Sequence, residues 1–157
     1  MDFLYKAHKE LLILLAQHKV DFMLIGGYSV IYYGYNRGTG DLDLWLRPDN
    51  KNKIKLLKAL QEFGIQSLDL DKLGKINFTG TNMFFIGGAP EKIDFLTHVQ
   101  NVIWDEAIHN VRYLPFENIQ VPVVGYHDLI LMKISSDRLK DKADIEELQK
   151  IRKFKEK

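Results

Sequence analysis

Two aspartates, Asp41 and Asp43, stand two residues apart in the segment Asp-Leu-Asp-Leu-Trp-Leu. On a β-strand, side chains two residues apart point to the same face, so this spacing presents two carboxylates together and turns the leucines the other way. Two like charges held this close repel each other unless a cation or a proton lies between them. Hard oxygen ligands suit Mg²⁺, which takes one or two carboxylates and completes its shell on substrate phosphates. The pair therefore predicts a site for Mg²⁺, or for Mn²⁺, together with a triphosphate.

A third acid, Asp94, lies in the segment Ile-Asp-Phe-Leu, flanked by bulky apolar residues on a predicted strand. A neighbouring strand would bring its carboxylate beside Asp41 and Asp43. Three acids around two metal ions about 3.5–4 Å apart form a geometry used for phosphoryl transfer. Each acid alone is also compatible with a solvated strand face, but their occurrence together with the glycine turn described next favours a site.

Gly26 and Gly27 follow a short apolar run, residues 22–25, and precede a short predicted helix. Backbone N–H groups at the start of a helix can donate to phosphate oxygens. Ser29 adds a candidate hydroxyl donor. We expect a branched side chain at Gly27 to stand where the phosphate must approach the backbone. These three residues are thus the predicted nucleotide-binding turn.

Two cations complete the candidate nucleotide-binding set. Arg37 precedes the first acid by four residues; it either neutralises the triphosphate in the transition state or forms an ion pair that orients Asp41 or Asp43. Lys133 interrupts an otherwise apolar predicted helix. Its ammonium group either snorkels to solvent or reaches a phosphate. The sequence leaves both pairs of alternatives open.

These motifs resemble the nucleotidyltransferase superfamily that includes DNA polymerase beta, whose signature is a hydrophobic residue, Gly-Gly or Gly-Ser, a spacer, and Asp-hydrophobic-Asp-hydrophobic. The matching residues here are Ile25, Gly26, Gly27, Asp41, Leu42, Asp43 and Leu44. Within it, the chain is most similar to small bacterial proteins of the minimal and abortive-infection type, often found in toxin–antitoxin systems. Gly34, Arg37 and Thr39 match their pattern, whereas Ser29 and Tyr33 replace the usual Ala and His. The resemblance covers residues from about 20 to 150.

The resemblance implies a nucleotidyltransferase (EC 2.7.7.-) that moves a nucleoside monophosphate from an NTP such as ATP to an acceptor hydroxyl. It implies that Asp41 and Asp43 hold the metal ions, and that Asp94 helps to ligate one of them and deprotonates the acceptor. The candidate acceptors are tRNA, a protein tyrosine and a small molecule, and a candidate partner is a cognate toxin or antitoxin protein. The alternative is a non-catalytic binding partner or antitoxin scaffold that retains the nucleotidyltransferase fold.

The elements that must position these residues follow from hydrophobic periodicity. We expect helices at residues 2–19, 28–33, 51–63, 102–108, 127–135 and 142–154, and strands at 22–25, 41–46, 76–78, 83–86, 92–97 and up to 121–124. Gly87 to Pro90 should form a hairpin turn. This order predicts one domain, residues 1–157, of the α+β or mixed α/β class. The resemblance implies a twisted mixed sheet backed by helices, with a helical C-terminus, and we expect those helices to cover one side of the sheet.

Composition narrows the function classes. The 157 residues include 22 basic and 21 acidic side chains, so the formal net charge is +1 and does not mark a dedicated nucleic-acid binder. Cysteine is absent, which excludes disulfides and thiolate metal sites. The apolar run at residues 11–16 is far shorter than the roughly 20 residues that span a bilayer. We therefore expect a cytoplasmic protein without a membrane segment.

Two further features have competing interpretations. Tyr28, Tyr32 and Tyr35 share a predicted helix face and could stack on a base, but packing in the core is the favoured interpretation. The last eight residues, 150–157, contain five basic side chains and one acid. They could bind RNA, but a solvated helix end, where cations complement the helix dipole, is favoured.

Overall fold

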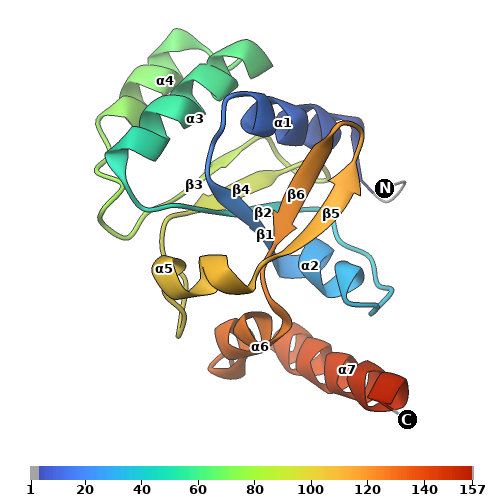
Figure 1. Cartoon of the computed structure of the whole chain (residues 1–157). Helices are drawn as coiled ribbons and strands as arrows, with labels where there is room; N and C mark the ends of the chain where they lie inside the picture. Colours follow the sequence, from blue (N-terminus) through green and yellow to red (C-terminus); the bar gives the residue numbers. More distant parts are fainter. Residues whose placement is uncertain (1–3, 157) are drawn as a thin grey trace.

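A computed structural model describes residues 4–156 and shows a mixed sheet with helices packed around it (Figure 1). The strands are β1 (Phe22–Ile25), β2 (Leu42–Leu46), β3 (Met83–Ile86), β4 (Ile93–Leu96), β5 (Arg112–Phe116) and β6 (Ile119–Val123). The helices are α1 (Lys6–Gln17), α2 (Gly26–Tyr32), α3 (Asn50–Phe63), α4 (Ser67–Gly74), α5 (Trp104–Ala107), η1 (Ile108–Asn110), α6 (Tyr126–Ile134) and α7 (Leu139–Glu156). Within the described part of the chain, no helix is long and apolar enough to cross a lipid bilayer.

The sheet has the strand order β3-β4-β2-β1-β6-β5. At its centre, β2 runs antiparallel to β1 and parallel to β4. The predicted hairpin of β3 and β4 forms one edge, and the antiparallel pair β5 and β6 forms the other. The mixed α/β class expected from the sequence is therefore confirmed.

Helices cover both faces of the sheet, so the expectation of cover on one side is wrong. Leu24 and Leu44 belong to a core cluster that also contains residues of α1 and α3. Met23 and Trp45, their neighbours on β1 and β2, belong to a second cluster with residues of α5, α6 and α7. In Figure 1, α1, α3 and α4 lie above the sheet, and α5, α6 and α7 lie below it. The reason is that the central strands carry apolar side chains on both faces.

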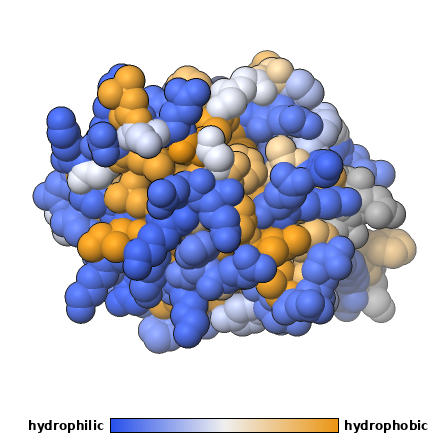
Figure 2. All heavy atoms as spheres, turned by 90° about the horizontal axis from the view of Figure 1, so that it is seen from above, coloured by the Kyte–Doolittle hydropathy of each residue, from blue (hydrophilic) through white to orange (hydrophobic). Residues whose placement is uncertain are grey.

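Two local predictions also need correction. Residues 76–78 form no strand; they lie in a turn, where the backbone N–H of Phe78 donates to Asn50 Oδ1 at 3.0 Å. Helix α4 precedes this turn and was not predicted, because its apolar positions are few and only Leu73 is buried. Seen from above, the molecule is mostly hydrophilic, with smaller hydrophobic areas between charged side chains (Figure 2).

Candidate active site

The structure brings the three predicted acids into one cleft. Asp43 on β2 lies directly opposite Asp94 on the parallel neighbour β4, and Asp41 immediately precedes β2. All three line a cleft of about 700 Å³ between the sheet and the α6–α7 region, together with Gly26 and Lys133. We call this hollow the acid cleft.

The carboxylates in the acid cleft are close enough to repel each other. Burial raises the pKa of Asp43 to about 7, and the negative charge of Asp94, a hydrogen bond shared with Asp94 and the charge of Asp41 act in the same direction. The positive charge of Lys133 opposes this shift. Without a bound cation, a proton on Asp43 thus relieves the repulsion near neutral pH.

Asp94 has an unsatisfied oxygen. Its side chain is buried, and Lys92 Nζ lies 3.2 Å from its Oδ1 as an ion pair. By distance this contact is an ion pair, and the buried Oδ1 accepts no hydrogen bond from residues 4–156. A buried acceptor that receives no hydrogen bond costs free energy and is a candidate ligand atom.

These observations fit a divalent metal ion. The available donors are carboxylate oxygens. The carboxylates of Asp43 and Asp94 repel each other across β2 and β4, and the buried Oδ1 of Asp94 has an ion pair with Lys92 but no hydrogen bond. Within the described residues, no three acidic or histidine side chains stand in a preformed metal cage. Mg²⁺ does not require one, since it is commonly bound by one or two carboxylates plus substrate phosphates.

The glycine turn packs directly against the acids. Gly26 has φ +67°, and a Cβ there would lie 2.8 Å from Asp43 Cγ. A Cβ at Gly27 would lie 2.7 Å from Thr39 Cβ. Both glycines line the acid cleft. The structure also gives a reason for glycine at position 27 that the sequence did not: a side chain there would displace Thr39.

Ser29 is not placed as expected. Its side chain is buried, does not line the acid cleft, and donates its hydroxyl hydrogen bond to the Gly26 carbonyl at 2.6 Å. The hydroxyl therefore holds the turn in shape, and we remove Ser29 from the nucleotide-binding set.

Arg37 and Lys133 are engaged in one ionic network. Arg37 donates through Nε and Nη2 to both oxygens of Asp144, at 2.8 and 3.0 Å, so its ion-pair partner is neither Asp41 nor Asp43. Lys133 is buried rather than snorkelling, and its Nζ lies 2.8 Å from Asp141 and 3.1 Å from Asp144. Both cations line the acid cleft. The network ties α6 and the loop before β2 to α7.

Sequence reasoning gave Asp141 and Asp144 no role. One signal could have identified them: they stand three residues apart and continue to Leu148 at a spacing of four, so all three share the buried stripe of α7. Acids on an apolar stripe require partners. Lys92 was also missed, although it stands two residues before Asp94.

A family described as "Nucleotidyltransferase of unknown function (DUF6036)" matches residues 3–154. The chain belongs to this family. A solved structure with a similar fold is the crystal structure of the lincosamide antibiotic adenylyltransferase LnuA with lincomycin bound, with a TM-score of 0.56 and 15% sequence identity. The likeness covers 94% of this chain and 98% of that one, and at this identity it shows the fold alone. A search of curated protein sequences finds no match. The resemblance and the nucleotidyltransferase fold expected from the sequence are confirmed.

Proposed function

We propose that this nucleotidyltransferase uses Mg²⁺ or Mn²⁺ to move a nucleoside monophosphate from an NTP to an acceptor hydroxyl in the acid cleft. The observation that carries the proposal is the register of β2 and β4, which sets Asp43 directly opposite Asp94. Asp41 and Asp43 would hold the metal ions, with Asp94 completing the ligand set. Bound divalent ions would stabilise the charge that develops on the transferring phosphoryl group.

The chain's own residues have distinct roles in this proposal. Gly26 and Gly27 bring backbone N–H groups toward the triphosphate at the start of α2. The acceptor oxygen attacks the α-phosphorus, the bond to the β-phosphate oxygen breaks, and pyrophosphate leaves. Asp94 takes the proton from the acceptor hydroxyl as a general base.

Four of the cations that line the cleft form two groups. Arg37 and Lys133 are already paired with acids of α7, so they position the cleft wall and add positive charge beside it. Arg138 and Lys140 also line the cleft, and both are exposed; Arg138 forms an ion pair with Asp141 at 3.4 Å at the surface. We assign to these two the screening of the β- and γ-phosphates.

The candidate acceptors are still tRNA, a protein tyrosine and a small molecule, and a role as the toxin or antitoxin of a two-component system belongs to the same proposal. The bound antibiotic in the structural neighbour shows that this fold can hold a small molecule in that protein. The rival function is a non-catalytic binding partner. The gathering of all three acids in one cleft favours the enzyme.

The test follows the fate of the phosphates. The protein is incubated with α-labelled or γ-labelled ATP, Mg²⁺ or Mn²⁺, and RNA, protein or small-molecule fractions of a bacterial extract. We expect the α-label in one fraction, the γ-label in pyrophosphate, and neither product with EDTA or with Asp43→Asn. Release of γ-label as inorganic phosphate would contradict nucleotidyl transfer, and absence of turnover with every fraction would favour the non-catalytic rival.

A further inference from the structure

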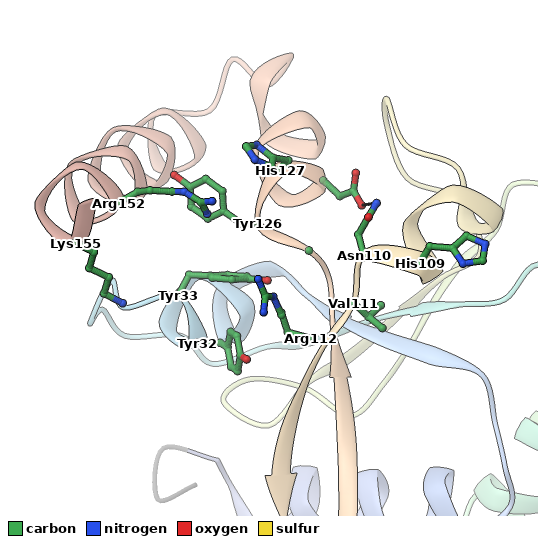
Figure 3. Close-up of a pocket in the computed structure, with 12 residues that line it drawn as sticks. Tyr32, Tyr33, His109, Asn110, Val111, Arg112, Tyr126, His127, Arg152 and Lys155 are labelled. Carbon is green, nitrogen blue, oxygen red and sulfur yellow. Dashed lines mark hydrogen bonds between the residues drawn. The ribbon is translucent and has the colours of Figure 1, made fainter. Parts of the chain in front are cut away.

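A second hollow, of about 680 Å³, lies away from the acid cleft and shares none of its described lining residues. Its size is within the roughly 300–1,000 Å³ typical of ligand sites. Figure 3 shows side chains from α2, β5, α6 and α7 around it. Its tyrosines and cations are Tyr32, Tyr33, Tyr126, Arg112, Arg152 and Lys155. We call it the tyrosine–cation pocket.

The tyrosines form a fixed aromatic wall. The ring of Tyr33 meets Tyr32 edge to face at 4.9 Å and Tyr126 at 5.6 Å. The Tyr33 hydroxyl donates to the Val124 carbonyl at 2.7 Å, which holds the ring in place. Tyr28 is buried in the core, as the sequence predicted. The rings of Tyr32, Tyr33 and Tyr126 keep part of their surface open to the pocket.

The cations in this pocket are largely unpaired. Arg112 and Lys155 are exposed, and neither forms an ion pair with any residue between positions 4 and 156. Arg152 lies 4.3 Å from the centroid of the Tyr126 ring, and its one ion pair with a described residue is with Glu156, at 3.5 Å. Asp128, the one acid among the described residues that line the pocket, accepts a hydrogen bond from Asn110. Positive charge is therefore in excess beside the aromatic wall.

We propose that the tyrosine–cation pocket binds nucleotide units of a single-stranded nucleic acid, with bases against the tyrosines and phosphates against Arg112 and Lys155. Aromatic faces combined with cations are the general means of binding single strands without reading their sequence. A smaller hollow of about 250 Å³ shares Tyr33, Tyr126, Arg152 and Lys155 with the pocket and continues along α7. This extension favours a strand over one free nucleotide, which offers the same chemistry.

Helix lengths place the pocket within reach of the acid cleft. Helix α2 begins with Gly26 at the cleft and ends with Tyr32 at the pocket, a rise of about 9 Å. Along α7, the rise from Asp141 to Arg152 is about 16 Å. A stacked strand with a rise of about 3.4 Å per nucleotide covers these distances in roughly three to five nucleotides. If the proposed transfer holds, the strand is its acceptor; binding itself does not depend on transfer.

The test measures binding in EDTA, where the acid cleft lacks metal. Anisotropy of a labelled 12-nucleotide single-stranded RNA is compared between the wild type, Arg112→Ala/Lys155→Ala, and a control, Lys51→Ala/Lys153→Ala. The control removes the same charge at exposed positions that line neither hollow. We expect a rise in Kd of about tenfold or more in the pocket variant only. In the pocket variant, the plot of the logarithm of the association constant against the logarithm of the salt concentration should become less steep by about 1.4, or 0.7 per lost phosphate contact.

Three outcomes would overturn the proposal. The wild type could fail to bind the RNA, or both double variants could lose affinity equally. AMP could displace the labelled RNA as well as an unlabelled 12-mer does, which would show that the pocket binds a free nucleotide and not a strand. Circular dichroism confirms that the variants fold, and Lys155→Glu provides a second test at an exposed position. Because no turnover is measured, these results are independent of the phosphate-fate experiment.

Discussion

The acid cleft and the tyrosine–cation pocket lie at opposite ends of α2 and α7, and they differ in which charges are left without partners. In the cleft, Arg37 and Lys133 are paired, and the carboxylates of Asp43 and Asp94 repel each other. In the pocket, Asp128 accepts a hydrogen bond, and Arg112 and Lys155 form no ion pair with a described residue. An anion can therefore enter the pocket directly, whereas a triphosphate should enter the cleft only with a cation. Binding of a triphosphate in the cleft should therefore require a divalent metal ion, whereas binding of an anion in the pocket should not.

The largest expected effect comes from Asp43→Ala. It should lower transfer by more than the roughly 10²–10⁴-fold that a lost general base costs, because a metal ligand is removed. RNA binding in EDTA should be unchanged, since Asp43 is not in the pocket. The control is Asp71→Ala, at an exposed acid of α4. Transfer above a tenth of the wild-type rate would contradict the role of Asp43.

Asp94→Asn should separate nucleotide binding from chemistry. The amide keeps the shape and one acceptor oxygen but cannot take the acceptor's proton. We expect metal–NTP affinity within roughly tenfold of wild type, about 1.4 kcal/mol, and transfer lower by about 10²–10⁴-fold. Calorimetry and single-turnover rates measure the two quantities. Loss of NTP binding would place Asp94 among the primary metal ligands, and a wild-type rate would make it a structural strand residue.

Asp144→Asn should affect stability. The change removes the negative charge that pairs with Arg37, which is mostly buried, and leaves Lys133 with Asp141 as its ion-pair partner among the described residues. We expect the free energy of unfolding in urea to fall by about 3 kcal/mol. The control is Glu146→Gln, which breaks a surface pair with Lys150 and should cost less than about 1 kcal/mol. Equal losses in the two variants would show that the network does not hold α7 to the cleft.

The smallest effect is a pH dependence in EDTA. The folded-state pKa of Asp43, about 7, lies above its ordinary value of 3.8. The folded state therefore binds the proton more tightly, and the resulting stabilisation is complete below pH 4 and lost as pH rises through 7. Between pH 4.5 and 8, we expect the wild type to lose about 1–3 kcal/mol relative to Asp43→Asn. Parallel pH profiles of the two proteins would show that the carboxylates do not repel each other.

Local sequence patterns predicted the strand that carries the acids. The alternation from Asp41 to Leu46 predicted a strand with acids on one face, and the register of β2 and β4 puts Asp94 beside Asp43. The alternation is accessible from the sequence because strand periodicity is a property of neighbouring residues. The strand expected at residues 76–78 was wrong because a short alternation of apolar and polar residues, here Ile-Asn-Phe, does not distinguish a strand from a turn with a buried aromatic ring.

The ionic network and the tyrosine–cation pocket could not be derived from neighbouring residues. Arg37 and Asp144 are 107 positions apart, and only the packing of α7 against the loop before β2 brings them together. The sequence offered two roles for Arg37, and the structure shows a different ion-pair partner. Likewise, Arg112 and Lys155 meet the tyrosines only through the arrangement of β5, α2 and α7.

The most direct test of the central claim is binding of a nucleotide that cannot be turned over. Calorimetry with α,β-methylene-ATP would compare the wild type with Asp43→Asn, in Mn²⁺ and in EDTA. We predict that the wild type binds in Mn²⁺ but not in EDTA, and that Asp43→Asn weakens binding in Mn²⁺ by about tenfold or more, at least 1.4 kcal/mol. Equal affinity with and without metal, or an unchanged affinity in Asp43→Asn, would contradict a metal–triphosphate site in the acid cleft.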